Sequence, residues 1–202
     1  VPGIDPDARH PLPPIARAAN RAIAPLVEPA PTKPAPESAP ASGESDRSRE
    51  IAAMDWQQLH DAIAQCTACP LCQWRQQAVF GVGNPQAKLV VVGEAPGEEE
   101  DRQGEPFVGR AGKLLDNMLA AIHEKRGERV FIANVLKCRP PGNRNPTLSE
   151  MLVCTPFLQR QLRLIEPKLI GCLGNVAIKF VIGPDSPGIT RIHGQWFTSI
   201  FG

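Results

Sequence analysis

Six cysteines are the residues of this sequence whose spacing most clearly indicates chemistry. Three of them, Cys66, Cys69 and Cys72, form a CxxCxxC motif. The others follow much further along the chain, at Cys138, Cys154 and Cys172. A CxxC pair brings two thiolates within reach of one metal, and two further cysteines would complete a four-coordinate site. The cysteines therefore predict a metal or redox centre rather than a disulfide framework.

The spacing of the cysteines leaves the identity of that centre open. Four thiolates suit zinc or an iron–sulfur cluster, and the CxxCxxC start, which is similar to that of ferredoxins, slightly favours a cluster. A ferredoxin pattern would also need a nearby fourth cysteine followed by proline, which is missing. Spacing does not decide which of the first three cysteines bind. Cys172 lies among apolar strand residues and is interpreted as a buried free thiol.

A glycine-rich segment, GEAPG at residues 93–97, directly follows a predicted strand. It is placed like a nucleotide-binding loop, but neither GxGxxG nor GxxxxGK[ST] is present. Four acidic residues follow at 98–101 and would repel a phosphate. We therefore expect the loop to approach a neutral planar group or a water molecule, because glycine lets the backbone come close. The alternative interpretation is an acidic helix start that the helix dipole stabilises.

Alternating strands and helices must position these groups. Short apolar runs predict strands at 88–93, 129–136, 168–173 and 195–200. Apolar residues at helical spacing predict helices after Asp55 and at 109–124, 148–164 and 174–182. This order indicates an α/β domain with a mostly parallel sheet, in which ligands bind at the carboxyl ends of the strands.

The first fifty residues differ in composition from the rest and hold 11 of the 22 prolines. Proline interrupts both helix and sheet, so residues 1–50 are predicted to be a disordered proline- and alanine-rich linker, and residues 51–202 a folded domain. The 22 Lys and Arg nearly balance 21 Asp and Glu, which excludes a highly charged nucleic-acid coat protein. No apolar run reaches 18 residues and no export signal is visible, so we expect a cytoplasmic protein without a membrane partner.

Three long segments, in order, resemble a known family. The sequence GEAPGEEEDRQGEPFVGRAGKLLDNML at 93–119 is similar to the first signature of the family-four uracil-DNA glycosylases, the iron–sulfur members of their superfamily. IANVLKCRPPGNRNP at 132–146 and LGNVAIKFVIG at 173–183 resemble two further blocks. The resemblance covers about residues 52–201. It implies a three-layer α/β/α fold with a central four-stranded, mostly parallel sheet, and a monomeric enzyme of DNA base-excision repair.

The resemblance also implies a [4Fe-4S] cluster and a DNA contact. By the resemblance, the cluster ligands are Cys66, Cys69, Cys138 and Cys154, which leaves Cys72 and Cys172 as non-ligands. The cluster would order the proline-rich loop between its last two ligands. The cations of this segment, Lys137, Arg139 and Arg144, are expected to meet DNA phosphates.

The family pattern implies a pocket for a uracil that has been flipped out of the DNA stack. Phe107 would stack on the base, and Asn134 would read its edge by donating to O4 and accepting from N3–H. Gly93, Glu94 and Ala95 would line the pocket, with Glu94 and Asn134 as the catalytic residues. Ala95 occupies the position of an aspartate in family-one enzymes, so bond cleavage before water attack is expected.

The sequence departs from the family pattern at its end. A histidine motif that stabilises the leaving uracil follows the last strand in the family, and the sequence stops before it. We interpret this as a truncation, with impaired activity. His193 precedes the last predicted strand and is expected to be a turn residue or a phosphate contact. The alternative function is a metal-cluster module that binds nucleic acid or uracil with little or no turnover; the partner of residues 1–50 stays unknown.

Overall fold

The computed structural model describes residues 46–201. Its first helix, α1 (Asp46–Ala53), crosses the predicted domain boundary at residue 50 and buries Ile51 in the core. The folded domain therefore already includes residues that we had predicted to belong to the linker. The rest of that predicted linker lies outside the described residues. Within the described part, no helix is long and apolar enough to cross a membrane.

Three adjacent parallel strands make up most of the sheet, as the apolar runs predicted. β2 (Leu89–Gly93) lies between β3 (Val130–Asn134) and β4 (Leu169–Cys172), and both neighbours run parallel to it. β2 and β3 are almost wholly buried, which is typical of strands covered on both faces. The register pairs Gly93 with Asn134, so the carboxyl ends of β2 and β3 lie side by side.

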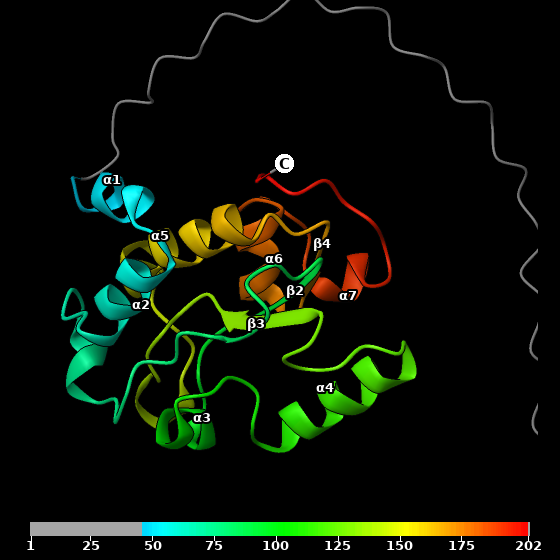
Figure 1. The fold of residues 1–202 in the computed structure, drawn as a ribbon, viewed down its shortest axis with the longest axis horizontal. Coiled ribbons are helices and arrows are strands. Elements are labelled where there is room, and N and C mark those ends of the chain that lie inside the picture. Colours follow the sequence, from blue (N-terminus) through cyan, green and yellow to red (C-terminus); the bar gives the residue numbers. More distant parts are fainter. Residues whose placement is uncertain (1–45, 202) are drawn as a thin grey trace, which may run out of the picture. The chain divides into compact units, whose positions relative to one another are not determined.

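Helices cover both faces of this sheet, in three layers (Figure 1). They are α1, α2 (Trp56–Ala64), α3 (Glu98–Gln103), α4 (Arg110–Ala121), α5 (Leu148–Ile165), α6 (Asn175–Val181) and α7 (Ile189–Ile192), with 3-10 helices η1 (Pro70–Gln73) and η2 (Pro141–Asn143). On one face, Val90 and Phe131 pack with α1, α2, α5 and α6. On the other, Val91 and Ile132 pack against α4. Alternate strand residues thus fill two separate cores.

Side-chain caps fix where α2 and α5 begin. Asp55 Oδ1 accepts from Gln58 N at 2.8 Å and starts α2, as predicted. The same reciprocal arrangement starts α5, where Thr147 Oγ1 accepts from Glu150 N at 3.3 Å and Glu150 Oε2 accepts from Thr147 N at 2.8 Å. Each capping box satisfies backbone donors that the first helical turn leaves free.

The fourth strand is not the one that we predicted. Residues 195–200 form no strand; Ile200 N donates to Val181 O at 2.9 Å and ties the segment to the end of α6. β1 (Val82–Gly83), antiparallel to β3, takes the place instead. The prediction rested on residue type, but Trp196 and Phe197 are adjacent and therefore break the alternation that marks a half-buried strand. The sheet nevertheless has four strands and is mostly parallel.

Candidate functional site

Gly93, Asn134 and Phe107 meet where β2 and β3 end. A Cβ atom built on Gly93 would lie 2.4 Å from Asn134 Oδ1 and 2.5 Å from Phe107 Cζ. Both distances are far below van der Waals contact, so any larger residue at Gly93 would displace one of the two side chains. The absence of a side chain at Gly93 is therefore what lets the amide and the ring approach each other.

The side chain of Asn134 is buried but incompletely satisfied. Asn134 is 2% exposed, and within the described part of the chain its Oδ1 atom has no hydrogen-bond partner. A buried acceptor without a partner costs about 1–3 kcal/mol. Such a cost is typical of a site whose missing donor comes from a ligand.

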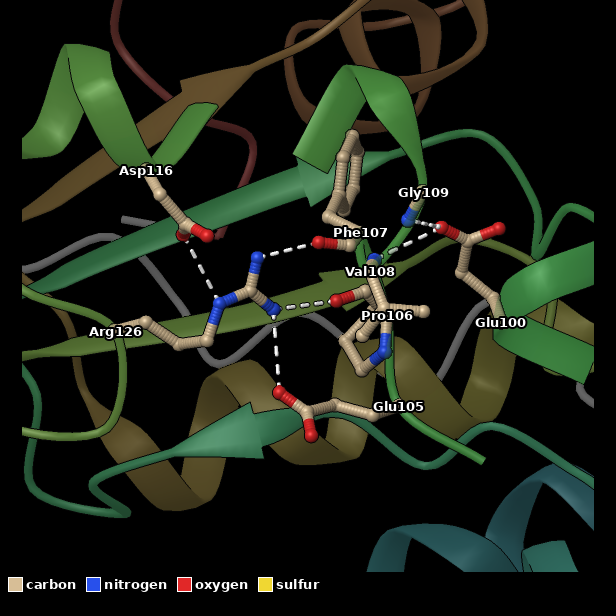
Figure 2. A network of polar contacts seen from close by, with 8 residues as sticks. All are labelled: Glu100, Glu105, Pro106, Phe107, Val108, Gly109, Asp116 and Arg126. Carbon is tan, nitrogen blue, oxygen red and sulfur yellow. Dashed lines mark hydrogen bonds and ion pairs between the residues drawn. The ribbon is translucent and has the colours of Figure 1, made fainter. Parts of the chain in front are cut away.

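Phe107 is held in an unusual backbone conformation. Its φ is +54°, a left-handed value that residues other than glycine rarely adopt. The start of α4 packs closely against it, since a Cβ on Gly112 would lie 1.7 Å from Phe107 O. On the following residues, Glu100 Oε1 accepts from Val108 N and Gly109 N, both at 2.9 Å (Figure 2). The ring is therefore presented by a loop with fixed main-chain contacts.

The same glutamate fixes the glycine-rich segment. Glu100 Oε2 accepts from Gly97 N at 3.1 Å and so closes the start of α3. Its neighbour Asp101 is 2% exposed and accepts from Gln76 N at 3.0 and 3.1 Å. The acidic run thus serves in part as structural acceptors for backbone N–H groups. Glu94, half-buried at the start of the segment, contributes its carbonyl to Leu136 N at 3.0 Å.

The four predicted cysteine ligands come from three parts of the chain. Cys66 follows α2, Cys69 precedes η1, Cys138 follows β3 and Cys154 lies within α5. The later two are buried, at 5% and 8% exposure. Burial raises the pKa of Cys154 to about 12, although nearby Lys137 opposes the shift; the thiols of Cys138 and Cys66 lie close enough to add to it.

Three of these four sulfurs accept a hydrogen bond from a nitrogen atom. Arg75 Nη1 donates to Cys138 Sγ at 2.9 Å, and the backbone N of Lys137 donates to Cys154 Sγ at 3.2 Å. Arg47 Nη2 lies 3.7 Å from Cys66 Sγ. Such donors stabilise thiolates, so the donor set fits a negatively charged sulfur-ligated group. Among residues 46–201, no three His, Cys, Asp or Glu residues are grouped as a single metal ion would need.

Sequence similarity to known proteins identifies the family of the chain. Residues 80–201 match the uracil DNA glycosylase superfamily. The chain is 54% identical over 136 residues to a type-4 uracil-DNA glycosylase of Archaeoglobus fulgidus, covering 66% of this chain and 68% of the relative. It is 46% identical over 137 residues to that of Thermotoga maritima, with 68% and 71% covered.

The chain belongs to the uracil-DNA glycosylase superfamily. A third relative, the type-4 enzyme of Sulfurisphaera tokodaii, is 44% identical over 142 residues, which cover 69% of this chain. The chain spans 64% of that relative, so less than two thirds of its length. The resemblance inferred from the sequence is thereby confirmed, as is the three-layer α/β fold of this superfamily member.

One predicted DNA contact is wrong. Lys137 is 2% exposed, and its Nζ donates to Asn134 O at 2.9 Å, Gln161 Oε1 at 2.7 Å and Phe80 O at 3.3 Å. Burial lowers the pKa of Lys137 to about 8. A side chain inside the core cannot reach a phosphate, because the segment turns inward directly after β3.

The other two predicted cations lie nearer the surface. Arg139 Nη2 is 3.4 Å from Glu98 Oε2, and its Nε donates to Asn143 Oδ1 at 2.7 Å. Arg144 is exposed, and it forms two hydrogen bonds with the carboxylate of Glu150, at 2.7 and 2.9 Å. Both side chains would need to exchange these partners, at least in part, to bind phosphates.

His193 is separate from the group around Asn134. It lines a cavity of about 470 Å³ between β4 and residues 193–199, which neither Gly93 nor Phe107 lines. This placement agrees with the interpretation of His193 as a turn residue, since its backbone ends α7.

Sequence reasoning missed two residues that support the site. Glu100 was interpreted as a charge that repels phosphate or favours a helix start, but not as a capping residue, although its position three residues after Gly97 is that of a capping box. Gln161 is 0% exposed and accepts from Lys137 Nζ at 2.7 Å. Its signal was a polar residue on the apolar face of α5, between Leu158 and Leu162.

Proposed function

We propose that this chain removes uracil from DNA by hydrolysing the N-glycosidic bond of a base flipped out of the stack. The observation that carries the proposal is the unpaired, buried Oδ1 of Asn134, held beside the Phe107 ring above Gly93. A planar base that supplies a donor to Oδ1 would remove the cost of this unpaired acceptor. The type-4 uracil-DNA glycosylases that the chain resembles support the choice of base.

The carboxamide of Asn134 suits uracil better than cytosine. Its oxygen accepts and its nitrogen donates, which matches N3–H and O4 of uracil. Cytosine presents an acceptor at N3 and a donor at N4, so the same amide orientation would meet two unmatched pairs. Each mismatch would leave a buried polar group unsatisfied, at about 1–3 kcal/mol.

The remaining pocket residues contribute stacking and charge stabilisation. Phe107 would stack on the uracil ring, because its loop fixes the ring at the edge of Gly93. Breaking the glycosidic bond leaves both bonding electrons on uracil and an oxocarbenium-like sugar. Backbone N–H groups of the 93–97 loop would stabilise the anion, although Pro96 has none and Gly97 N already donates to Glu100 Oε2. Glu94 would orient the water that then attacks the sugar; the proton that this water loses is taken up by the uracil anion through solvent, so the products are free uracil and an abasic sugar.

A [4Fe-4S] cluster is the second part of the proposal. Cys66, Cys69, Cys138 and Cys154 would hold it, supported by their burial and by the nitrogen donors to three of their sulfurs. When bound, the cluster would supply structural cross-linking between the elements rather than redox chemistry.

An excision assay tests the function. The chain is incubated with a labelled single-stranded oligonucleotide that carries uracil or cytosine at one position, and alkali then cleaves abasic sites. We expect cleavage at uracil only, and a loss of at least about tenfold in Asn134→Ala, as expected for an unpaired buried partner. Asn117→Ala, on the exposed face of α4, is the matched control. Equal release of cytosine, or release of neither base, would overturn the proposal.

A further inference from the structure

Arg126 makes an unusual set of contacts beneath the Phe107 loop. It lies between α4 and β3, and only 16% of its side chain is exposed. Nη1 donates to Pro106 O and Nη2 to Phe107 O, each at 2.5 Å. Nε lies 3.0 Å from Asp116 Oδ1, and Nη1 lies 3.4 Å from Glu105 Oε1 (Figure 2). The guanidinium therefore binds two successive carbonyls and two carboxylates.

The two carbonyls belong to the residue with the left-handed backbone and the one before it. Holding a phenylalanine at φ +54° costs free energy, so the conformation persists only where surrounding contacts favour it. A planar guanidinium can bind two neighbouring carbonyls at once, because its N–H groups form a rigid fork. On the C-terminal side of Phe107, Glu100 accepts hydrogen bonds from Val108 N and Gly109 N. Phe107 is thus held from both directions.

The flanking carboxylates fix the orientation of the guanidinium. Asp116 comes from α4 and Glu105 from the loop itself, so the arginine links the helix to the loop. A surface ion pair would not need these carbonyl contacts. Arg129, three residues later, shows the contrast: its side chain is 69% exposed, and it pairs with Glu124 and His123 O.

We propose that Arg126 is a positioning residue that sets the stacking ring of Phe107 in the uracil pocket. This inference rests on the proposed function, because it assigns to Phe107 the role of stacking on the base. Arg126 itself does not touch the base; it acts by holding the backbone that carries the ring. Losing the fork would let Phe107 relax from its left-handed conformation and withdraw the ring from Gly93.

The test compares the affinities of variants for single strands that carry uracil or cytosine at one position, measured by fluorescence anisotropy. Arg126→Gln should weaken binding of the uracil strand by about tenfold and leave the cytosine strand unchanged. Arg129→Gln is the matched control and should leave both unchanged. In a Phe107→Ala background, Arg126→Gln should cause no additional loss, because the ring through which it acts is gone.

A second variant distinguishes loss of the carbonyl contacts from a failure of Arg126→Gln to fold. Arg126→Lys keeps the charge near Asp116 and Glu105 but lacks the fork, so it should also lose the uracil preference while its melting temperature stays near that of the wild type. An unchanged uracil preference in Arg126→Lys, or a further loss in the Phe107→Ala background, would overturn the inference. A wild-type chain without any uracil preference would instead overturn the proposed pocket, so the two failures are distinguishable.

Discussion

At the scale of single residues, Lys137 connects the candidate pocket to the core. Its ammonium donates to the carbonyl of Asn134 and to the side chain of Gln161, and the residue is only 2% exposed. Lys137 therefore stabilises the end of β3, from which the Asn134 side chain reaches the pocket. Its charge is compensated by the carbonyl dipoles of Phe80 and Asn134 and by the amide oxygen of Gln161.

Replacing this lysine should be costly to the fold. Lys137→Met leaves buried acceptors without a donor, so we expect the free energy of unfolding to fall by about 2–4 kcal/mol. Chemical denaturation measures it. Arg139→Gln is the control: it should change stability by less than about 1 kcal/mol but lower the salt dependence of DNA binding by about one unit. A lysine variant as stable as the wild type would contradict the burial argument.

The sequence predicted part of the site, and burial explains the rest. The spacing of the cysteines indicated a metal or redox centre, the family resemblance implied Asn134 and Phe107, and the structure brings these two together at Gly93. Lys137 was misassigned because a cation in a polar loop sequence looks exposed until the inward turn after β3 is known. Arg126 was missed because the contacts that hold the Phe107 loop are made to backbone carbonyls, which leave no trace in the sequence.

At the scale of elements, α4 illustrates how periodicity overstates burial. Five large apolar residues lie at helical spacing in α4 and at its C-cap, but of these five only Leu115 and Leu119 are buried. Leu114, Met118 and Ile122 are more than half exposed, at 61%, 55% and 59%. The helical pattern was therefore predicted correctly, whereas the width of the face that packs on the sheet was not.

Two neighbouring leucines on α4 provide a matched pair. Leu115→Ala removes a side chain packed between α4 and the sheet, so it should lower the free energy of unfolding by about 2–4 kcal/mol. Leu114→Ala should cost less than about 1 kcal/mol, since its side chain is mostly solvated. Thermal unfolding measures both; equal losses would show that the face of α4 is assigned wrongly.

The capping box at the start of α5 contributes to the free energy of unfolding in a pH-dependent way. Hydrogen bonds from Arg144 lower the pKa of Glu150 to about 2, below its ordinary value near 4.5. The contribution of the ionised carboxylate is therefore complete above about pH 5 and is lost as pH falls toward 2. Glu150→Gln should cost about 1–2 kcal/mol at pH 7 and progressively less at pH 4 and 3. A constant difference across these pH values, measured by urea unfolding, would contradict this assignment.

The predicted elements at the chain centre were correct because their signals are local. β2 and β3 are apolar runs rich in β-branched residues, β4 is a short apolar run, and α2 has a capping residue at Asp55. The prediction of a strand at 195–200 was wrong. β1 was missed because a two-residue strand is defined by its partner rather than by its own sequence. Pairing of Val82 with Ile132 is a tertiary contact, which local patterns do not contain.

At the scale of the whole molecule, the proposed cluster would join the end of α2, the exit of β3 and the middle of α5. Cys138→Ala should therefore abolish both bound iron and visible absorbance near about 400 nm, and lower the melting temperature. Cys172→Ala, on β4, is the matched control and should keep all three properties. Iron content close to that of the wild type in Cys138→Ala would remove this cysteine from the ligand set.

The most direct test of the account is the binding preference of the pocket itself. Equilibrium binding is measured for one single strand with uracil and the same strand with cytosine, using the wild type and Asn134→Ala. We expect the wild type to bind the uracil strand at least about tenfold more tightly than the cytosine strand, and Asn134→Ala to bind both strands equally. Equal affinities in the wild type, or a preference that survives in Asn134→Ala, would contradict the account.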